Sequence, residues 1–180
     1  MSRVLIVETS LHKDSNSDIL AEEFARGARD AGHDVECVSL RGKRIGFCIG
    51  CMKCQEGGGC VISDDAKDIA ESIRFSDAVA FSTPVYFFGM SGQMKVLLDR
   101  TNPLYMQDPR FRSIYLLAAG AGTEDYLVDG TVTGLKGWIG CFDGCRLEGV
   151  VCAKGAVQGG DVRKDAASLQ AAYEMGRSVR

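Results

Sequence analysis

Four cysteines crowd into a short stretch of the chain. Cys48, Cys51, Cys54 and Cys60 lie within 13 residues, with the spacing Cys-x2-Cys-x2-Cys-x5-Cys. Four thiolates this close together suit a [4Fe–4S] cluster, because each iron of the cluster takes one thiolate. Residues 57–59 are all glycine and would let the backbone turn Cys60 back toward the other three. The alternatives are a zinc ion, which more often takes two separated pairs of ligands, or free thiols.

A polar loop covering residues 8–18 follows the first apolar run of the sequence. It matches neither GxGxxG nor GxxxxGK[ST], so it carries no dinucleotide fingerprint and no P-loop. Ser10, Asn16 and Ser17 instead offer hydroxyl and amide groups where a helix is predicted to begin. Free N–H groups at a helix N-terminus attract phosphate, so the loop predicts a phosphate site. The alternative is that Ser15 or Ser17 only caps the helix.

A second loop, residues 83–92, combines aromatic and apolar side chains after a buried strand. The C-terminal end of a strand is normally exposed to solvent. A cluster of aromatic residues there suits a flat aromatic ligand that needs stacking surfaces and backbone hydrogen bonds. A local hydrophobic cluster or an interface between subunits would explain the same residues.

The elements that must position these loops alternate between strand and helix. Apolar, β-branched runs predict strands at 3–8, 35–40, 78–82, 113–119 and 147–153. Helical spacing of apolar residues predicts helices at 17–31, 63–75, 93–100, 131–142 and 161–179. Strands that are apolar throughout indicate a parallel sheet covered on both faces, of Rossmann-like or flavodoxin-like order. In either order, a ligand lies beyond the C-terminal ends of the strands.

The composition limits the number of domains and the classes of function. A chain of 180 residues with 46% hydrophobic residues suits one domain, residues 1–180, with a cysteine-rich loop at 41–62. The net charge of -3 offers no broad basic surface for nucleic acid. No apolar run is long enough to cross a membrane, and no signal peptide is recognisable. The chain is therefore expected to be cytoplasmic. Eight cysteines without such a signal point away from a disulfide framework and toward metal or redox chemistry.

Several phrases together resemble a known family. Thr83-Pro84-Val85-Tyr86, Gly92-Gln93-Met94-Lys95 and Asp99-Arg100 resemble the NAD(P)H-dependent FMN reductases of the flavodoxin-like superfamily. The loop from Ser10 to Ser17 stands where that family carries its phosphate loop, with Leu11 and His12 in place of Pro and Arg. The cysteine spacing resembles that of the iron–sulfur flavoproteins, a branch of the same superfamily. The resemblance implies an α/β three-layer sandwich with a five-stranded parallel sheet of order 2-1-3-4-5 and helices on both faces.

The same resemblance implies which residues bind which cofactor. The FMN phosphate would be held by Ser10, His12, Asn16, Ser17 and Ile19. The isoalloxazine would be bounded by Pro84, Val85, Tyr86, Phe87, Phe88, Gly89, Ala119, Gly120 and Gly122. A [4Fe–4S] cluster would be ligated by Cys48, Cys51, Cys54 and Cys60. No dedicated acid or base is expected, because the cofactor carries the chemistry.

The implied activity is that of an oxidoreductase. It would move electrons from NAD(P)H, or from a ferredoxin, through FMN to a small acceptor such as a quinone, with the cluster as a possible relay. A homodimer or homotetramer is expected, with the strip Tyr86-Phe87-Phe88 and the loop around Tyr105-Met106 as interface candidates. The rival interpretation is a non-enzymatic binding or regulatory α/β module with a structural zinc in the cysteine loop.

The remaining cysteines and the single tryptophan are predicted to serve the core. Cys37, Cys141, Cys145 and Cys152 lie in predicted strands and helices, where a free cysteine packs as a small apolar residue. Trp138 is likewise expected to pack inward.

Overall fold

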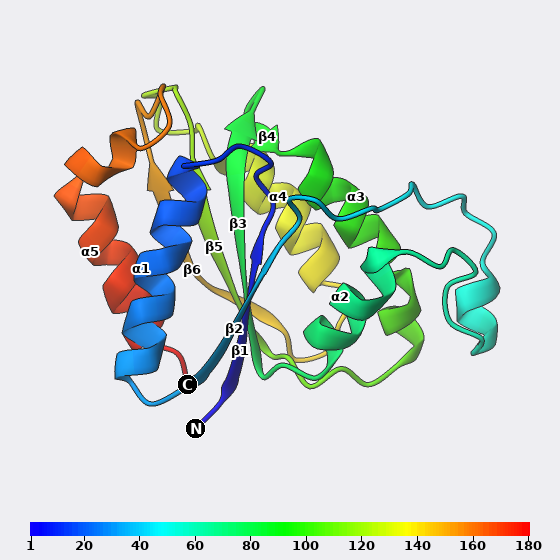
Figure 1. Cartoon of the computed structure of the whole chain (residues 1–180). Helices are drawn as coiled ribbons and strands as arrows, with labels where there is room; N and C mark the ends of the chain where they lie inside the picture. The colour runs from blue at the N-terminus through cyan, green and yellow to red at the C-terminus, as the bar shows by residue number, and fades with distance from the viewer.

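The computed structural model covers residues 1–180 and has one main parallel sheet between two layers of helices (Figure 1). The sheet order is β2-β1-β3-β5-β6, which confirms the predicted order of the five main strands. A sixth, two-residue strand, β4, pairs antiparallel with the end of β3. The strands are β1 (Arg3–Glu8), β2 (Asp34–Ser39), β3 (Ala78–Tyr86), β4 (Gly89–Met90), β5 (Ser113–Ala119) and β6 (Arg146–Ala153).

Helices cover both faces of the sheet. On one face lie α1 (Asn16–Asp30) and α5 (Ala166–Arg177); on the other lie α2 (Asp65–Arg74), α3 (Gly92–Arg100) and α4 (Asp129–Ile139). Three short 3-10 helices are η1 (Lys53–Glu56), η2 (Asn102–Met106) and η3 (Asp161–Lys164). The two faces carry separate hydrophobic clusters of 17 and 22 buried residues. None of the helices has the length and apolar character needed to cross a membrane.

Local signals explain where the helices begin. Asp64 caps α2 by accepting a hydrogen bond from Ala66 N, and Ser91 caps α3 by accepting one from Met94 N. Asp165 caps α5, so the predicted helix 161–179 is divided into η3 and α5 at that residue. Each cap holds the first turn of a helix at the sheet edge where the loops gather.

Strand β3 continues beyond its predicted end at residue 82. Its pairing with β5 runs to Pro84, opposite Ala119, whereas its pairing with β1 ends at Ser82. Because β1 has already ended, the missing N–H of Pro84 leaves no partner unpaired on that side. The aromatic segment is therefore the end of a central strand that extends beyond its neighbour β1, and not a free loop.

Two of the four core predictions for cysteines were wrong. Cys37 is exposed because β2 is an edge strand, and Cys141 is exposed because α4 ends at Ile139, before the predicted end. Cys145 and Cys152 are half-buried and pack against the core, as expected. Trp138 also packs inward, stacked on Phe111 with ring centroids 5.4 Å apart.

Candidate functional site

The β1–α1 loop, residues 9–15, lies at the C-terminal edge of the sheet and leads directly into helix α1. Ser10, Ser15 and Ser17 are almost fully buried. Ser15 occupies the N-cap position, yet its side chain makes no capping bond and instead lies 3.0 Å from the hydroxyl of Ser17. The N–H groups of the first helical turn are thus left without a side-chain cap, which is the arrangement that receives an anion.

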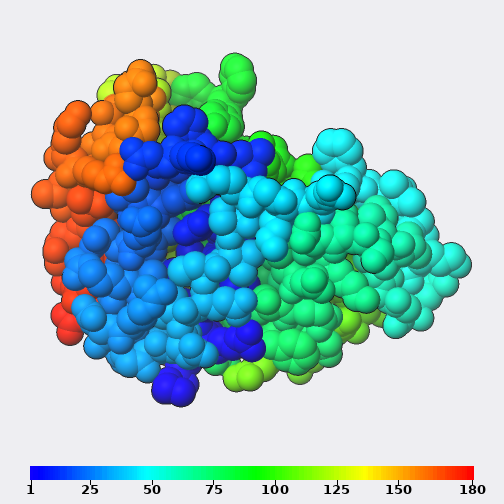
Figure 2. Space-filling model, viewed as in Figure 1, coloured from blue at the N-terminus to red at the C-terminus, as the bar shows by residue number.

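Asn16 connects this loop to a segment far away in the sequence. Its amide nitrogen donates to the main-chain oxygen of Gln158 at 2.8 Å, and its amide oxygen accepts from the N–H of Val162 at 3.1 Å. Asp14 and Arg163 form an ion pair at 2.6 Å between the same two segments. In Figure 2 the blue surface of the β1–α1 loop adjoins the orange surface of the segment after β6. Asn16 therefore serves chiefly to hold two walls of one cavity together.

That cavity has a volume of about 350 Å³ and is formed where the segments after β1, β3, β5 and β6 meet. Its size falls within the range of small-molecule sites, roughly 300–1,000 Å³. Nine of the predicted cofactor-binding residues line it: Ser10, His12, Asn16, Ser17, Pro84, Val85, Tyr86, Ala119 and Gly120. The serines provide a polar end, and Pro84, Val85 and Ala119 provide an apolar one.

Five predicted residues do not line the cavity. Ile19 is buried in the core between α1 and the sheet, because its side chain points to the inner face of the helix. Phe87 and Phe88 form the tip of the β3–β4 hairpin, where Phe87 is fully exposed and Phe88 packs on Tyr126. Gly89 belongs to β4, and Gly122 lies beyond the cavity wall.

One wall of the cavity was not predicted from the sequence. Residues 156–159, after the last strand, line the cavity, as do Ser15 and Ala121. A side chain on Gly159 would place its Cβ 3.1 Å from Asp14 O and 3.3 Å from His12 Cε1. The pair Gly159-Gly160, in the segment between β6 and η3, was the available signal, since glycine permits such a close approach of two backbones.

A buried carboxylate, Asp18, lies in the first turn of α1 next to the lining residue Ser17. Asp18 accepts hydrogen bonds from Ser82 Oγ at 3.0 Å and from Arg41 at 3.1 Å. Burial raises the pKa of Asp18 above its usual value, and the hydrogen bond from Ser82 opposes that rise. Arg41 is the only cation in contact with this carboxylate.

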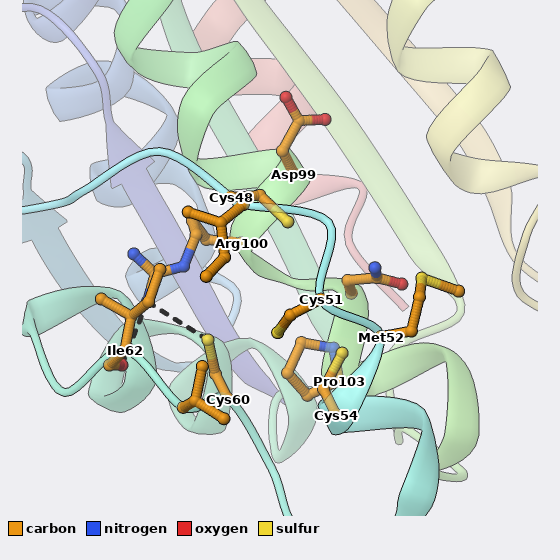
Figure 3. A pocket seen from close by; sticks show the side chains of 12 residues that line it. Cys48, Cys51, Met52, Cys54, Cys60, Ile62, Asp99, Arg100 and Pro103 are labelled. Carbon is orange, nitrogen blue, oxygen red and sulfur yellow. Dashed lines mark hydrogen bonds between the residues drawn. The ribbon is translucent and has the colours of Figure 1, made fainter.

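The cysteine loop, residues 41–62, extends from the body of the molecule beside α3, as Figure 2 shows in cyan. The predicted turn is present, since Gly57 and Gly59 both have positive φ, at 88° and 72°. All four predicted cysteines line one cavity, shown in Figure 3. Cys48 and Cys51 are exposed, whereas Cys54 and Cys60 are half-buried.

The donor set at the cysteine cavity consists of four thiols, the ligands that a [4Fe–4S] cluster takes. No three His, Cys, Asp or Glu side chains in the chain converge closely enough to hold one metal ion. In a [4Fe–4S] cluster each thiolate binds a different iron, so the four sulfurs surround a shared space without meeting at one point. The cavity that the four cysteines share is small, about 20 Å³.

The comparisons with known proteins agree on one family. The family model described as NADPH-dependent FMN reductase matches residues 2–137. An iron–sulfur flavoprotein of Archaeoglobus fulgidus is 30% identical over 133 residues, 72% of this chain and 60% of that protein. One of Methanocaldococcus jannaschii is 35% identical over 102 residues, 57% of this chain and 53% of that protein. The chain thus matches little more than half the length of these relatives.

Two further proteins match almost from end to end. A Bacillus subtilis protein named as an NAD(P)H-dependent FMN-containing oxidoreductase is 28% identical over 96% of both chains. The NAD(P)H:quinone oxidoreductase from Methanothermobacter marburgensis superposes with a TM-score of 0.75 over 99% of both chains at 22% identity, which supports the flavodoxin-like fold. The chain belongs to the NADPH-dependent FMN reductase family.

Proposed function

We propose that this protein is an FMN-dependent oxidoreductase whose cofactor occupies the cavity between the segments after β1, β3, β5 and β6. The observation that carries the proposal is the meeting, in one cavity, of an uncapped helix N-terminus with buried hydroxyls at one end and an apolar slot at the other. Family membership supports both the cofactor and the class of enzyme. The cavity belongs to a single FMN-binding domain, residues 1–180.

The polar end suits the phosphate. Ser10, Ser15 and Ser17 would donate hydrogen bonds together with the N–H groups of the first turn of α1. These donors are uncharged, so no cation has to be stripped of water when the phosphate enters. His12 lines the same cavity and offers a ring nitrogen. The phosphate would thus be held mainly by neutral donors and the helix dipole.

The apolar end suits the isoalloxazine. Pro84, Val85 and Ala119 supply flat contact surface, and Tyr86 is an exposed aromatic side chain at the rim. Gly120 keeps the slot open, because a Cβ at this position would lie 3.1 Å from Val85 Cβ. When bound, FMN would take up hydride from NAD(P)H and pass the electrons to an acceptor. The residues of the chain orient the ring and shield one side from water.

We further propose that Cys48, Cys51, Cys54 and Cys60 ligate a [4Fe–4S] cluster. Support comes from the four thiols that line one cavity and from the iron–sulfur flavoproteins among the relatives. A cluster transfers electrons one at a time, so it would link the two-electron chemistry of FMN to one-electron partners.

The wider setting is also a proposal. The acceptor is a small molecule such as a quinone, the electron donor is NAD(P)H or a ferredoxin, and two or four copies of the chain associate. The exposed strip at residues 86–88 supplies an apolar surface for that association. All eight cysteines are free, which supports a reducing, cytoplasmic environment.

A comparison of FMN with riboflavin tests the cofactor site. Fluorescence titration of the flavin-free protein should show tighter binding of FMN, since riboflavin lacks the phosphate. Ser10→Ala should weaken FMN binding by about fivefold, equivalent to about 1 kcal/mol, and leave riboflavin binding nearly unchanged. Ser178→Ala, at an exposed serine far from the cavity, is the control. Equal binding of the two flavins by the wild type would contradict the proposal.

Metal analysis tests the cysteine cavity. Protein isolated or reconstituted without oxygen should hold about four irons and four sulfides per chain. Cys54→Ser should lose iron but keep FMN, because the two cavities have no lining residue in common. A colourless, zinc-loaded protein that takes up no flavin would favour a non-enzymatic binding module instead.

A further inference from the structure

Arg100, the last residue of α3, is buried so deeply that only 1% of its side chain is exposed. Its Nη1 atom donates to Gly46 O at 2.8 Å and to Asp64 Oδ2 at 2.7 Å. Its Nη2 atom donates to Asp64 Oδ1 at 2.9 Å, to Ile62 O at 3.2 Å and to Cys60 Sγ at 3.5 Å. One guanidinium therefore contacts segments on both sides of the cysteine cluster.

The contacts of Arg100 close the cysteine loop at its base. Gly46 precedes the first cysteine of the cluster, and Ile62 and Asp64 follow the last one. Asp64 strengthens the closure, since its carboxylate also accepts a hydrogen bond from Gly46 N at 2.7 Å. The guanidinium and the carboxylate form a bidentate pair, which fixes direction as well as distance. The two ends of the cysteine loop are thus held together beside the cavity.

Three observations relate Arg100 to the cavity itself. Figure 3 shows its guanidinium beside Cys60, with the hydrogen bond to the sulfur drawn as a dashed line. Arg100 also lines the cavity that the four cysteines share. Its Nε atom is buried without a hydrogen-bond partner, which leaves an N–H donor free at the cavity wall. Buried donors normally find acceptors, and the sulfur atoms of a cluster are acceptors.

The ion pair with Asp64 leaves the Nε–H donor of Arg100 without an acceptor. The two carboxylate oxygens of Asp64 are engaged by Nη1 and Nη2. The Nε–H group therefore takes no part in the ion pair that closes the loop. A purely structural clamp has no use for a buried unpaired donor, which costs about 1–3 kcal/mol.

We propose that Arg100 is a positioning residue for the cluster, which fixes Cys60 at the cavity and donates N–H···S hydrogen bonds that raise the reduction potential of the cluster. This inference rests on the proposed [4Fe–4S] site. Reduction adds one electron to the cluster, with no bond made or broken in the protein. Hydrogen-bond donors and a nearby cation stabilise the added negative charge, so the reduced form is favoured.

Arg100→Gln tests the proposal, because glutamine lacks the charge and cannot make five hydrogen bonds at once. Mediated redox titration, followed by the absorption of the cluster, measures the potential. The reduction equilibrium constant should fall about tenfold, which corresponds to about 59 mV for one electron. Lys95→Gln removes a positive charge from the exposed side of the same helix and should leave the potential unchanged.

Arg100→Lys is a second variant that tests the proposal if the glutamine variant fails to fold. Lysine keeps the charge but cannot span the same acceptors, so iron content or potential should fall less than in the glutamine variant. Iron and FMN are counted per chain in each preparation. Loss of iron with FMN retained, in either variant but not in the Lys95 control, supports the positioning role. Wild-type iron content and wild-type potential in either variant would overturn it.

The failure of the inference can be told apart from the failure of the cluster site. A wild-type protein that takes up no iron under reconstitution removes the cluster, and this inference with it, while leaving FMN binding intact. A wild-type cluster whose potential is the same in the Arg100 variants removes the role of Arg100 alone.

Discussion

Arg41 of the cysteine loop forms an ion pair with Asp18 of α1, the helix whose first turn lines the cavity proposed for FMN. One guanidinium nitrogen of Arg41 donates to Asp18 Oδ2 at 3.1 Å and to His12 O at 3.0 Å. Arg41 is the first residue of the cysteine loop, and His12 lines the cavity. We expect Arg41→Gln to weaken FMN binding about fivefold, because the loss of these partly exposed bonds costs about 1 kcal/mol. Fluorescence titration of the flavin-free protein gives the dissociation constant.

The matched control is Arg44→Gln, which removes an exposed arginine from the same loop. It should leave the FMN dissociation constant unchanged. If both substitutions weaken binding equally, the effect comes from net charge rather than from the contacts of Arg41. High salt would then abolish the difference between each variant and the wild type.

Phe87 is expected to take part in self-association. It is fully exposed, and its φ of 50° is a left-handed conformation that phenylalanine adopts at a cost. Burial of such a side chain against a second copy would contribute about 2 kcal/mol. Phe87→Asn favours the same turn without the apolar ring, so it should weaken association at least tenfold in sedimentation equilibrium. Phe75→Asn, at the opposite end of β3, should have no such effect; an unchanged Phe87 variant would contradict the prediction.

Close packing against α5 sets the position of helix α1. A Cβ on Gly176 would lie 2.1 Å from Phe24 O, so Gly176→Ala must push the two helices apart. We expect the free energy of unfolding to fall by about 1–3 kcal/mol, as measured by denaturant titration. Gly137→Ala is the opposite case, since its Cβ would meet nothing within 4 Å on helix α4. That substitution should stabilise the protein by up to about 1 kcal/mol.

Most of the fold could be predicted from the sequence because its local signals agree with one another. The apolar runs gave all five main strands, and apolar spacing gave the five α-helices to within a few residues. The sheet order came from the family resemblance, since alternating strands and helices left two orders open. The extension of β3 was not predictable, because Pro84 is tolerated there only through the early end of β1.

The candidate site was predicted less completely. Ser10 and Pro84 line the cavity, since loops that follow parallel strands must meet at one edge. Ile19 does not, because helical periodicity turns its side chain into the core. The wall formed by residues 156–159 depends on a contact between segments some 145 residues apart, as the Asn16–Val162 bond shows with a separation of 146. No local pattern reports a contact of that kind.

Asp165 allows a test of pH-dependent stability away from either cavity. Its carboxylate accepts a hydrogen bond from Ser168 N at 3.0 Å and caps α5, and hydrogen bonding with Ser168 lowers the pKa of Asp165. Because the folded pKa lies below the unfolded value of about 3.9, the stabilisation is complete above that value and is lost as the pH falls through the folded pKa. Asp165→Ala should lower the free energy of unfolding by about 1 kcal/mol at pH 7, and by less below about pH 4. Asp165→Asn keeps a neutral cap and should lose less at pH 7, and its deficit should also shrink toward pH 3, because only the wild-type carboxylate titrates. A constant deficit for the alanine variant from pH 7 to pH 3 would contradict the assignment.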